Sequence, residues 1–536
     1  MTKQLHQTIG RWFLSLLVTT VLFGSARATT LFGTYTIDAT QAASTTNFQN
    51  LSSAITYLTS AGTRADAGPA NAAPFGVSGQ VVFNFAAGTG PYSDQTIIPA
   101  IPGASPINNI IINGNGCTMQ FNTAVSGAYH IIRLNGADHV TINGLIVKPT
   151  NVTQGWGIHF MGGADSNTIR GCRIDLTLVT TANTNSGGII FSSSTTGVTS
   201  TGVNGYSNLI INDTILNPAA AAGSYYSIIN MQNSSATYSG NKFIGNVVEN
   251  SFYMSYYSQN TNGTLIKDNE FHATLKNTST TRYEIYCASG HTNDTITGNR
   301  FHDPMGTVPN TNQYYGITIY SGSNVLISNN RFYNIRTNGD IYTLYINSSP
   351  TTRIYHNVIS LDYTASSASA SNFTYGLNAN SSTPLDFRNN IVSMTRGGAS
   401  TKVPVYLSTA GTYTVNNNDY YVTGQNAYIG FNNGALYSNL GSWKSANFPF
   451  DTSSYTYNPR YVSATNLTSQ EAMLNNAGAN VLTYVPVDAN NTARTSTPDI
   501  GSFEFSPSAG EDAGVISISA PNIPFNAGSY PVSAKI

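Results

Sequence analysis

The chain has 536 residues, which is enough for one large domain or several small ones. Only 9% of the residues are charged, against about 25% in an average soluble protein, and the formal net charge is −1. This balance argues against nucleic acid as a partner, because phosphate binding needs a basic face. Neutral polar residues and 33 Tyr instead suit a secreted protein or a sheet-rich solenoid.

The N-terminus has the order of a secretory signal peptide, which we assign to residues 1–28. Lys3 and Arg11 come before the apolar run 12–24, and the small residues of "ARA" at 26–28 offer a cleavage site. A membrane anchor is the alternative, but this run of 13 residues is shorter than the roughly 20 that cross a bilayer. We therefore expect an exported protein, extracellular or at the cell surface, with no membrane span.

Residues 29–107 are expected to hold an N-terminal cap and the first strands. Within them, 47–58 predict a short helix that closes the end of the fold, with Thr46 or Asn47 as its N-cap. The apolar side of this helix would consist of Phe48, Leu51, Ile55 and Leu58. The run "GQVVFNF" at 79–85 is expected to be the first strand.

A unit of about 30 residues recurs through 108–430. Its copies include "GADHVTING" (136–144), "GADSNTIRG" (163–171) and "GSNVLISNNRFYNI", which begins at Gly322. Short strands at a fixed period indicate stacked turns, because one turn cannot bury its apolar side alone. A propeller blade would take about 40–45 residues, and the leucine-rich pattern is absent. The sequence therefore predicts an all-β parallel β-helix solenoid of about eleven rungs, with a loop at 192–205 inserted into one long turn.

An Asn-x-apolar step marks one corner of each turn. The Asn residues at this corner are Asn241, Asn269, Asn299, Asn330, Asn357, Asn390 and Asn418. Upstream, the corner is assigned to Gly114, Gly144, Cys172 and Asp213. Stacked Asn side chains can pass hydrogen bonds from amide to amide along the axis, and Asn tolerates the left-handed backbone that a corner needs. We expect these Asn to form a structural ladder.

The three Cys, at 117, 172 and 287, are too few and too scattered for a disulfide framework or a zinc site. We expect them to be small buried residues, and we expect no metal and no cofactor. Beyond the repeats, 431–510 are expected to hold the C-terminal rungs and cap.

Both ends of the repeat region carry motifs of a known family. "VSGQVVFNFAAGTGPYSDQ" (77–95) and "NNIIINGNG" (108–116) resemble the start of right-handed parallel β-helix domains in large exported bacterial surface proteins. "VDANNTAR" (487–494) and "PDIGSFEF" (498–505) resemble the segment that closes such domains. The resemblance implies a right-handed coil of the pectate-lyase-like superfamily. That superfamily includes lyases, hydrolases, adhesins and tailspikes, so the fold alone does not choose a function.

The last stretch, 511–536, is interpreted as a linker and the truncated start of an Ig-like module. It resembles the first two strands of such a module, but an Ig-like sandwich takes about 100 residues. We expect the natural polypeptide to continue.

One outward column next to the Asn corner is the best candidate site. It is predicted to run Lys242, Glu270, Arg300 and Arg331, with His272, His302 and Tyr333 two residues further along each strand and Asp303 beside them. Arg and His could bind an acidic sugar, and a His could move a proton. A solvated face with Glu270 paired to Arg300 is the simpler interpretation.

A second candidate is a set of outward aromatic residues, Tyr286, Tyr320 and Tyr345, which could stack on sugar rings. Alternation around Tyr320 is expected to place Tyr315 with Ile317 and Ile319 on the opposite, inner face. Tyr chosen only for its strand propensity is the simpler interpretation here as well.

The leading hypothesis is a non-catalytic secreted or cell-surface scaffold or adhesin module that binds a glycan or another surface component. The alternative is a polysaccharide lyase or glycoside hydrolase that acts on the outer face, with His272, His302, Arg300 and Arg331 as its catalytic residues. Ca²⁺ would be needed only by a lyase. No Asp pair, Gly-His-Asp or Arg-Ile-Lys motif of polygalacturonase-like enzymes occurs. The sequence indicates no oligomeric state.

Overall fold

The computed structural model describes residues 30–235, 239–275, 280–306 and 310–507, together with the backbone of two short strands near the C-terminus. These strands, β42 (Ser517–Ala520) and β43 (Ser533–Lys535), form an antiparallel pair. The expected signal peptide and the remainder of the Ig-like segment lie outside the described residues.

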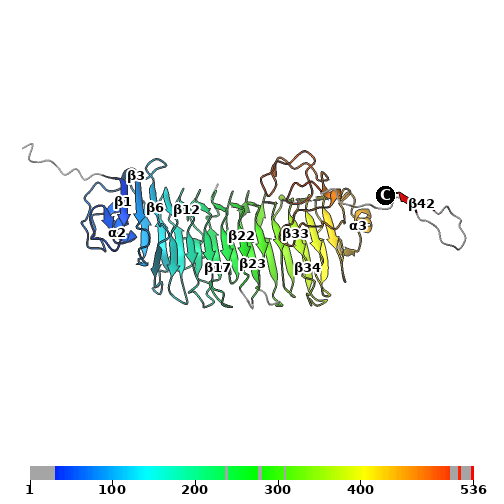
Figure 1. Cartoon of the computed structure of the whole chain (residues 1–536), viewed down its shortest axis with the longest axis horizontal. Helices are drawn as coiled ribbons and strands as arrows, with labels where there is room; N and C mark the ends of the chain where they lie inside the picture. The colour runs from blue at the N-terminus through cyan, green and yellow to red at the C-terminus, as the bar shows by residue number, and fades with distance from the viewer. Residues whose placement is uncertain are drawn as a thin grey trace, which may run out of the picture.

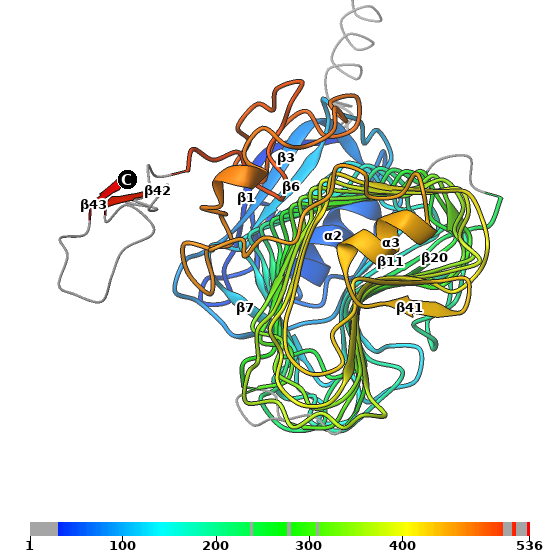
Figure 2. The ribbon, with the colours of Figure 1, turned by 90° about the vertical axis from the view of Figure 1, so that its right-hand side faces the viewer.

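The described residues coil into a right-handed parallel β-helix of about eleven turns, as the sequence predicts. The turns stack along a rod, and an end-on view superposes them (Figures 1 and 2). Each turn contributes one strand to each of three sheets.

Sheet 1 contains, in spatial order, β2 (Asn47–Phe48), β1 (Leu31–Ile37), β3 (Val77–Phe85), β6 (Ile110–Asn113), β9 (Val140–Asn143), β12 (Thr168–Arg170), β15 (Leu209–Ile211), β18 (Lys242–Ile244), β21 (Leu265–Lys267), β25 (Thr295–Thr297), β29 (Leu326–Ser328), β32 (Thr352–Tyr355), β35 (Leu385–Arg388) and β38 (Tyr413–Asn416). Sheet 2 contains β4 (Tyr92–Ser93), β7 (Thr118–Phe121), β10 (Ile146–Pro149), β13 (Arg173–Asp175), β16 (Thr214–Leu216), β19 (Val247–Glu249), β22 (Glu270–His272), β26 (Arg300–His302), β30 (Arg331–Tyr333), β33 (Val358–Leu361), β36 (Ile391–Met394) and β39 (Asp419–Val422). Sheet 3 contains β5 (Thr96–Pro99), β8 (His130–Asn135), β11 (Trp156–Met161), β14 (Gly187–Phe191), β17 (Tyr226–Met231), β20 (Met254–Gln259), β23 (Arg282–Cys287), β27 (Tyr314–Ile319), β31 (Ile341–Asn347), β34 (Phe373–Asn380), β37 (Thr401–Leu407), β40 (Gly430–Asn432) and the antiparallel β41 (Ala435–Tyr437). A small parallel pair, β24 (His291–Thr292) with β28 (Gly322–Ser323), lies outside these sheets.

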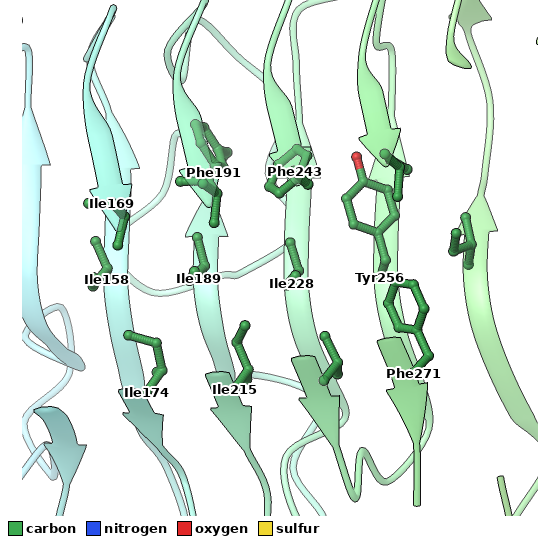
Figure 3. Close-up of a cluster of buried hydrophobic side chains, with 14 of the residues drawn as sticks. Ile158, Ile169, Ile174, Ile189, Phe191, Ile215, Ile228, Phe243, Tyr256 and Phe271 are labelled. Atoms are coloured by element: carbon green, nitrogen blue, oxygen red, sulfur yellow. The ribbon is translucent and has the colours of Figure 1, made fainter. Parts of the chain in front are cut away.

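The core consists of apolar side chains that repeat from turn to turn. Figure 3 shows columns of isoleucine, including Ile158, Ile189 and Ile228, that point inward from successive strands of sheet 3. The rings of Phe271, Phe301 and Phe332 in sheet 2 stack at centroid distances of 5.1 and 4.6 Å. The three Cys are buried and free, as expected.

The N-terminal end is closed by the helix α2 (Leu51–Thr59), which buries Leu51, Ile55 and Leu58. The helix begins later than the sequence predicts, because Asn50 is its N-cap and accepts a hydrogen bond from the backbone N–H of Ser53 at 2.8 Å. Residues 47 and 48 instead form the edge strand β2. The expected first strand, within β3, is also preceded by β1, with which it pairs in parallel.

The Asn ladder runs without a break through the second half of the coil, but Asn241 is not a member. Asn246 holds that position: its Nδ2 donates to Oδ1 of Asn269 at 2.9 Å, and Asn269 donates to Asn299 at 3.0 Å. Asn241 directly precedes β18 of sheet 1 and accepts a hydrogen bond from Asn208 at 3.3 Å, in a different ladder. The further links join Asn330, Asn357, Asn390 and Asn418.

The upstream corner also differs by a few residues from the sequence alignment. Strand pairing of Ile146 with Thr118 and Arg173 places Leu145 and Cys117 in the ladder column, where Gly144 and Gly114 were expected. The left-handed backbone lies one residue before the ladder, for example at Gly298 (φ 71°) and Asn329 (φ 56°). The ladder Asn are therefore selected for their hydrogen bonds and not for a positive φ.

After β41, the described chain adds no strand to the three sheets. The helix α3 (Leu440–Ala446) packs at the C-terminal end, and residues 451–505 run back along the outside of the coil. We call this segment, which includes a short 3-10 helix η1 (Ala472–Leu474), the C-terminal wrap; Figure 1 shows it in orange beside the yellow and green turns. None of the helices among the described residues is long and apolar enough to cross a membrane.

The wrap is fixed to the coil at the left-handed corner positions. The backbone N–H of Ala479 donates to Oδ1 of Asn389 at 2.7 Å, and Nη2 of Arg494 donates to Oδ1 of Asn329 at 3.0 Å. Its apolar residues Leu474 and Ile500 bury the outer face of sheet 2. The outward column of that sheet is accordingly apolar at Val358 and Ile391, under the wrap, and charged just before them.

Candidate functional site

Three neighbouring strands of sheet 2 bring most of the predicted charged column together. Glu270, Arg300 and Arg331 lie in register on β22, β26 and β30. One column further, the rings of His272, His302 and Tyr333 stack, with centroids 5.2 and 4.8 Å apart and planes within 12°.

Lys242 is not part of this column. It lies on β18 in sheet 1, opposite Leu209 and Leu265, because its turn was aligned on Asn241 instead of Asn246. Val247 of sheet 2 occupies the place next to Glu270.

The charged column forms one wall of a cleft of about 520 Å³, and the C-terminal wrap forms the other. The wrap contributes Thr465, Asn466, Thr468, Asn490 and Phe503. Sequence reasoning missed these residues, because the wrap has no repeat that would reveal where it lies. The cleft therefore lies next to the part of sheet 2 that the wrap covers, on the side of the earlier turns.

The imidazole of His302 is held between two carboxylates. Its Nε2 lies 2.9 Å from Oε1 of Glu270, and its Nδ1 lies 2.9 Å from Oδ2 of Asp303. The second oxygen of Glu270 pairs with Arg300. Asp303 also accepts a hydrogen bond from Nδ2 of Asn334 at 3.4 Å.

These contacts set the charges of the cleft. Burial would lower the pKa of His302, but its hydrogen bonds to Asp303 and Glu270, with their negative charges, raise it to about 9. The hydrogen bond from His302 and the charge of Arg300 hold the pKa of Glu270 at about 2, against the opposing effect of burial. Burial and the neighbouring His302 lower the pKa of His272. At neutral pH, His302 is therefore a cation between two anions.

Arg331 is the cation of the cleft that is least satisfied. Its Nη2 donates to the backbone carbonyl of Gly298 at 3.0 Å, and its guanidinium lies 5.3 Å from the ring centroid of Phe503. Its Nε is buried and has no hydrogen-bond partner among the described residues. Burial and the charge of Arg300 lower the pKa of Arg331. A half-buried cation with no carboxylate partner among the described residues favours an anionic ligand.

Summed over Glu270, Arg300, His302, Asp303 and Arg331, these charged groups give the cleft one net positive charge. Both nitrogens of His302 and both oxygens of Glu270 are already engaged, so neither group is free to exchange a proton with a bound sugar. The same engagement makes the carboxylates poor ligands for Ca²⁺, which prefers six to eight oxygens. No group of three His, Cys, Asp or Glu side chains in the described part of the chain is arranged to hold a metal ion.

The predicted aromatic set lies on the outer face of sheet 3. Tyr286 and Tyr345 share one register column, with Thr318 between them, whereas Tyr320 follows the end of β27 and is 48% exposed. The prediction that side chains alternate strictly between the inner and outer faces, with Tyr315 on the inner face, is wrong in this sheet. Tyr315 stacks on its outward neighbours, and a Cβ on the following residue, Gly316, would lie 2.6 Å from the core ring of Phe332.

No protein-family model and no curated protein matches the sequence. Among solved structures, the chain is similar to the surface adhesin PfbA of Streptococcus pneumoniae, with 13% identity over 67% of this chain and 81% of that one and a TM-score of 0.36. It is similar to the pectate lyase Pel9A, with 12% identity over 80% and 89% and a TM-score of 0.31. A third is DFA-IIIase from Arthrobacter chlorophenolicus A6 without its lid, with 13% identity over 75% and 92% and a TM-score of 0.36. At these identities and TM-scores, the likeness says nothing about what this chain binds or catalyses.

Proposed function

We propose that this chain is an exported, non-catalytic β-helix module that binds an acidic glycan in the cleft between sheet 2 and the C-terminal wrap. The order of charged, apolar and small residues in 1–28 supports export. The observation that carries the ligand class is the guanidinium of Arg331, which makes a hydrogen bond to a backbone carbonyl and no ion pair among the described residues, beside the exposed Arg300. Together they offer guanidinium donors to the carboxylate of a uronic acid.

The state of His302 supports binding without catalysis. General acid–base catalysis needs a group that can give or take a proton at the scissile bond. With a pKa of about 9 and both nitrogens bonded to carboxylates, His302 positions Glu270 and Asp303 and has no remaining contact for a sugar. Tyr333 is 7% exposed and its pKa is raised by burial, so it stays a neutral phenol.

The test is titration of the purified chain with oligogalacturonate by calorimetry, together with an assay of the same mixture for new reducing ends and unsaturated products. We expect binding without product release. Arg331→Gln should weaken binding at least tenfold, and Arg300→Gln should weaken it several-fold because that side chain is 45% exposed.

The matched control is Arg173→Gln, since Arg173 lies in the same outward column of sheet 2, outside the cleft, and is similarly exposed at 49%. This change should leave binding unaltered. Product release that Arg331→Gln abolishes would replace the proposal with a lyase or hydrolase. Equal losses in all three variants would mean that the cleft is not the binding site.

A further inference from the structure

The outer face of sheet 3 changes character halfway along the coil. In the earlier turns, the inserted loop folds onto this face, and its Val198 packs with Trp156, Ile190 and Ile229. From β20 onward, the two outward columns consist largely of tyrosine, and only the first of these residues, Tyr257, packs against this cluster. One column runs Tyr283, Tyr315, Tyr342 and Tyr375; the other runs Tyr257, Tyr286, Thr318, Tyr345, Asn378 and Tyr406. We call these ten residues the tyrosine face.

The tyrosine face carries no charged side chain, in contrast to the cleft on sheet 2. A neutral surface neither attracts nor orients a charged ligand. Its strands are paired on both sides, so it offers no free edge to an added strand. The groups that the tyrosine face can offer to a ligand are therefore ring surfaces and phenolic hydroxyls, which recur at the strand spacing of about 4.8 Å.

The ring planes show which surfaces are available. Tyr315 and Tyr342 stack face to face, with centroids 4.6 Å apart and planes 3° apart, so each covers a face of the other. Tyr345 is perpendicular to both, at 89° and 90°. Because the faces of Tyr315 and Tyr342 are occupied, it is their edges that meet the face of Tyr345. One face of Tyr345 therefore rests on this stack, and the opposite face is turned away from it.

Tyr286 repeats the perpendicular contact two turns earlier and, unlike Tyr345, also packs against a ring of its own column, that of Tyr257, with centroids 5.7 Å apart and planes 27° apart. It lies at 86° to Tyr283, whose own face is covered by Tyr315 at 4.5 Å. The small Thr318 separates Tyr286 from Tyr345 in the column. The two flat rings are thus two strand spacings apart, about 10 Å, which is close to the length of one disaccharide in an extended β-1,4-linked glycan.

We infer that the tyrosine face is a binding site for an uncharged, extended β-1,4-linked glycan, with alternate sugar rings resting on Tyr286 and Tyr345. The apolar face of a pyranose stacks on an aromatic ring through its C–H groups. Phenolic hydroxyls, including that of the exposed Tyr320, supply hydrogen bonds to the sugar hydroxyls. A straight, repetitive and neutral surface matches a straight, repetitive and neutral polymer. This inference does not depend on the acidic-glycan cleft, and the two can fail separately.

The experiment is calorimetric titration of the purified chain with cellohexaose, mannohexaose and N-acetylchitohexaose. At least one of them should bind, and Tyr345→Ala should weaken that binding tenfold or more. Tyr345→Phe, which keeps the ring and loses only the hydroxyl, should cost less than threefold. Tyr286→Ala should act like Tyr345→Ala, and Arg331→Gln should have no effect.

Tyr457→Ala is the matched control, because Tyr457 is 41% exposed on the wrap, away from sheet 3. Circular dichroism and the unfolding midpoint of each variant show whether it is folded. The inference is overturned if none of the three hexasaccharides binds, or if binding is unchanged in the Tyr286→Ala/Tyr345→Ala double variant. It is also overturned if light scattering shows that the main effect of the double variant is to abolish self-association of the chain.

Discussion

Glu270 and His302 lie on neighbouring turns, and Oε1 of the carboxylate meets Nε2 of the imidazole at 2.9 Å. With Asp303 on the other ring nitrogen, this contact raises the pKa of His302 to about 9. We expect the ring resonances of His302 to titrate near that value in an NMR experiment. Glu270→Gln should lower the pKa of His302 by more than one unit. His272 provides an internal control, because its pKa should lie below the ordinary value in the same spectra.

The same contact makes stability depend on pH. Since the pKa of His302 is higher in the folded chain than the ordinary 6.5, the contribution is fully present below about pH 6.5 and is lost as the pH rises through 9. We expect a loss on the order of 2 kcal/mol in the free energy of unfolding, allowing for partial solvent screening. Denaturant unfolding at pH 6 and pH 10 measures it. His302→Gln should remove this part of the pH dependence; an unchanged slope would contradict the assignment.

A second pH effect is predicted at the start of the Asn ladder. Asp213 is buried where the later turns have Asn: its Oδ1 accepts from the backbone N–H of Cys172 at 2.6 Å, and its Oδ2 has no partner. Burial raises the pKa of this carboxyl to about 8, so it is mainly protonated at neutral pH and resembles the amide. Below about pH 4 this carboxyl is protonated in both the folded and the unfolded chain. Between about pH 4 and pH 8 the unfolded chain ionises it more readily than the folded chain does, so the free energy of unfolding falls over this range.

Asp213→Asn should therefore stabilise the chain, and the gain should grow from near zero at pH 4 to on the order of 3–5 kcal/mol above pH 8. The reverse change on the next turn, Asn246→Asp, should destabilise it with the same pH profile. Chemical unfolding of the three proteins across this range tests the pair. A pH-independent difference would show that Asp213 is ionised throughout.

The sequence predicts the repeat, the short strands and the contact of Glu270 with Arg300, because all of these follow from a motif that recurs every turn. It does not resolve the register where the motif is ambiguous. "SGNKFIGNVVEN" contains two Asn that each precede an x-apolar step, and average spacing favours Asn241. The real intervals, 33 residues from Asp213 to Asn246 and 23 from Asn246 to Asn269, are uneven. Lys242 was misplaced for this reason.

The other wall of the cleft was not predictable from periodicity. Arg494 reaches Asn329 across 165 residues, and Gly501 reaches His356 across 145, with no repeat to indicate either contact. A weaker signal was present. The outward residues of sheet 2 that follow Arg331 in its column are Val358 and Ile391, and an apolar outward pair in a solenoid implies that some other segment covers it.

A fourth prediction concerns the interior of the ladder. Asn299 donates through Nδ2 to Asn330 and to the backbone carbonyl of Ile266, and its Oδ1 accepts from Asn269. Asn299→Ala leaves these buried groups without partners and should cost about 2–4 kcal/mol of unfolding free energy. Thr297→Ala, two residues earlier and partly exposed, should cost less than about 1 kcal/mol. Equal losses in urea unfolding would mean that the ladder adds little beyond the backbone pairing.

The last prediction is that the C-terminal wrap can open without unfolding of the coil. Leu474 and Ile500 are fully buried, but they pack on the outer face of sheet 2, against Val358 and Ile391, and not in the interior. Leu474→Ala should remove about 2–3 kcal/mol from this contact. Amide hydrogen exchange in the wrap should then accelerate by roughly 30- to 160-fold, while exchange in β23 of sheet 3 stays unchanged. Met473→Ala, at the neighbouring 49%-exposed position, should alter neither region.

If the wrap and β23 lose protection together, the two form one cooperative unit. If only the wrap does, Leu474→Ala should also weaken ligand binding in the cleft, because Phe503 and Asn490 are no longer held opposite Arg331.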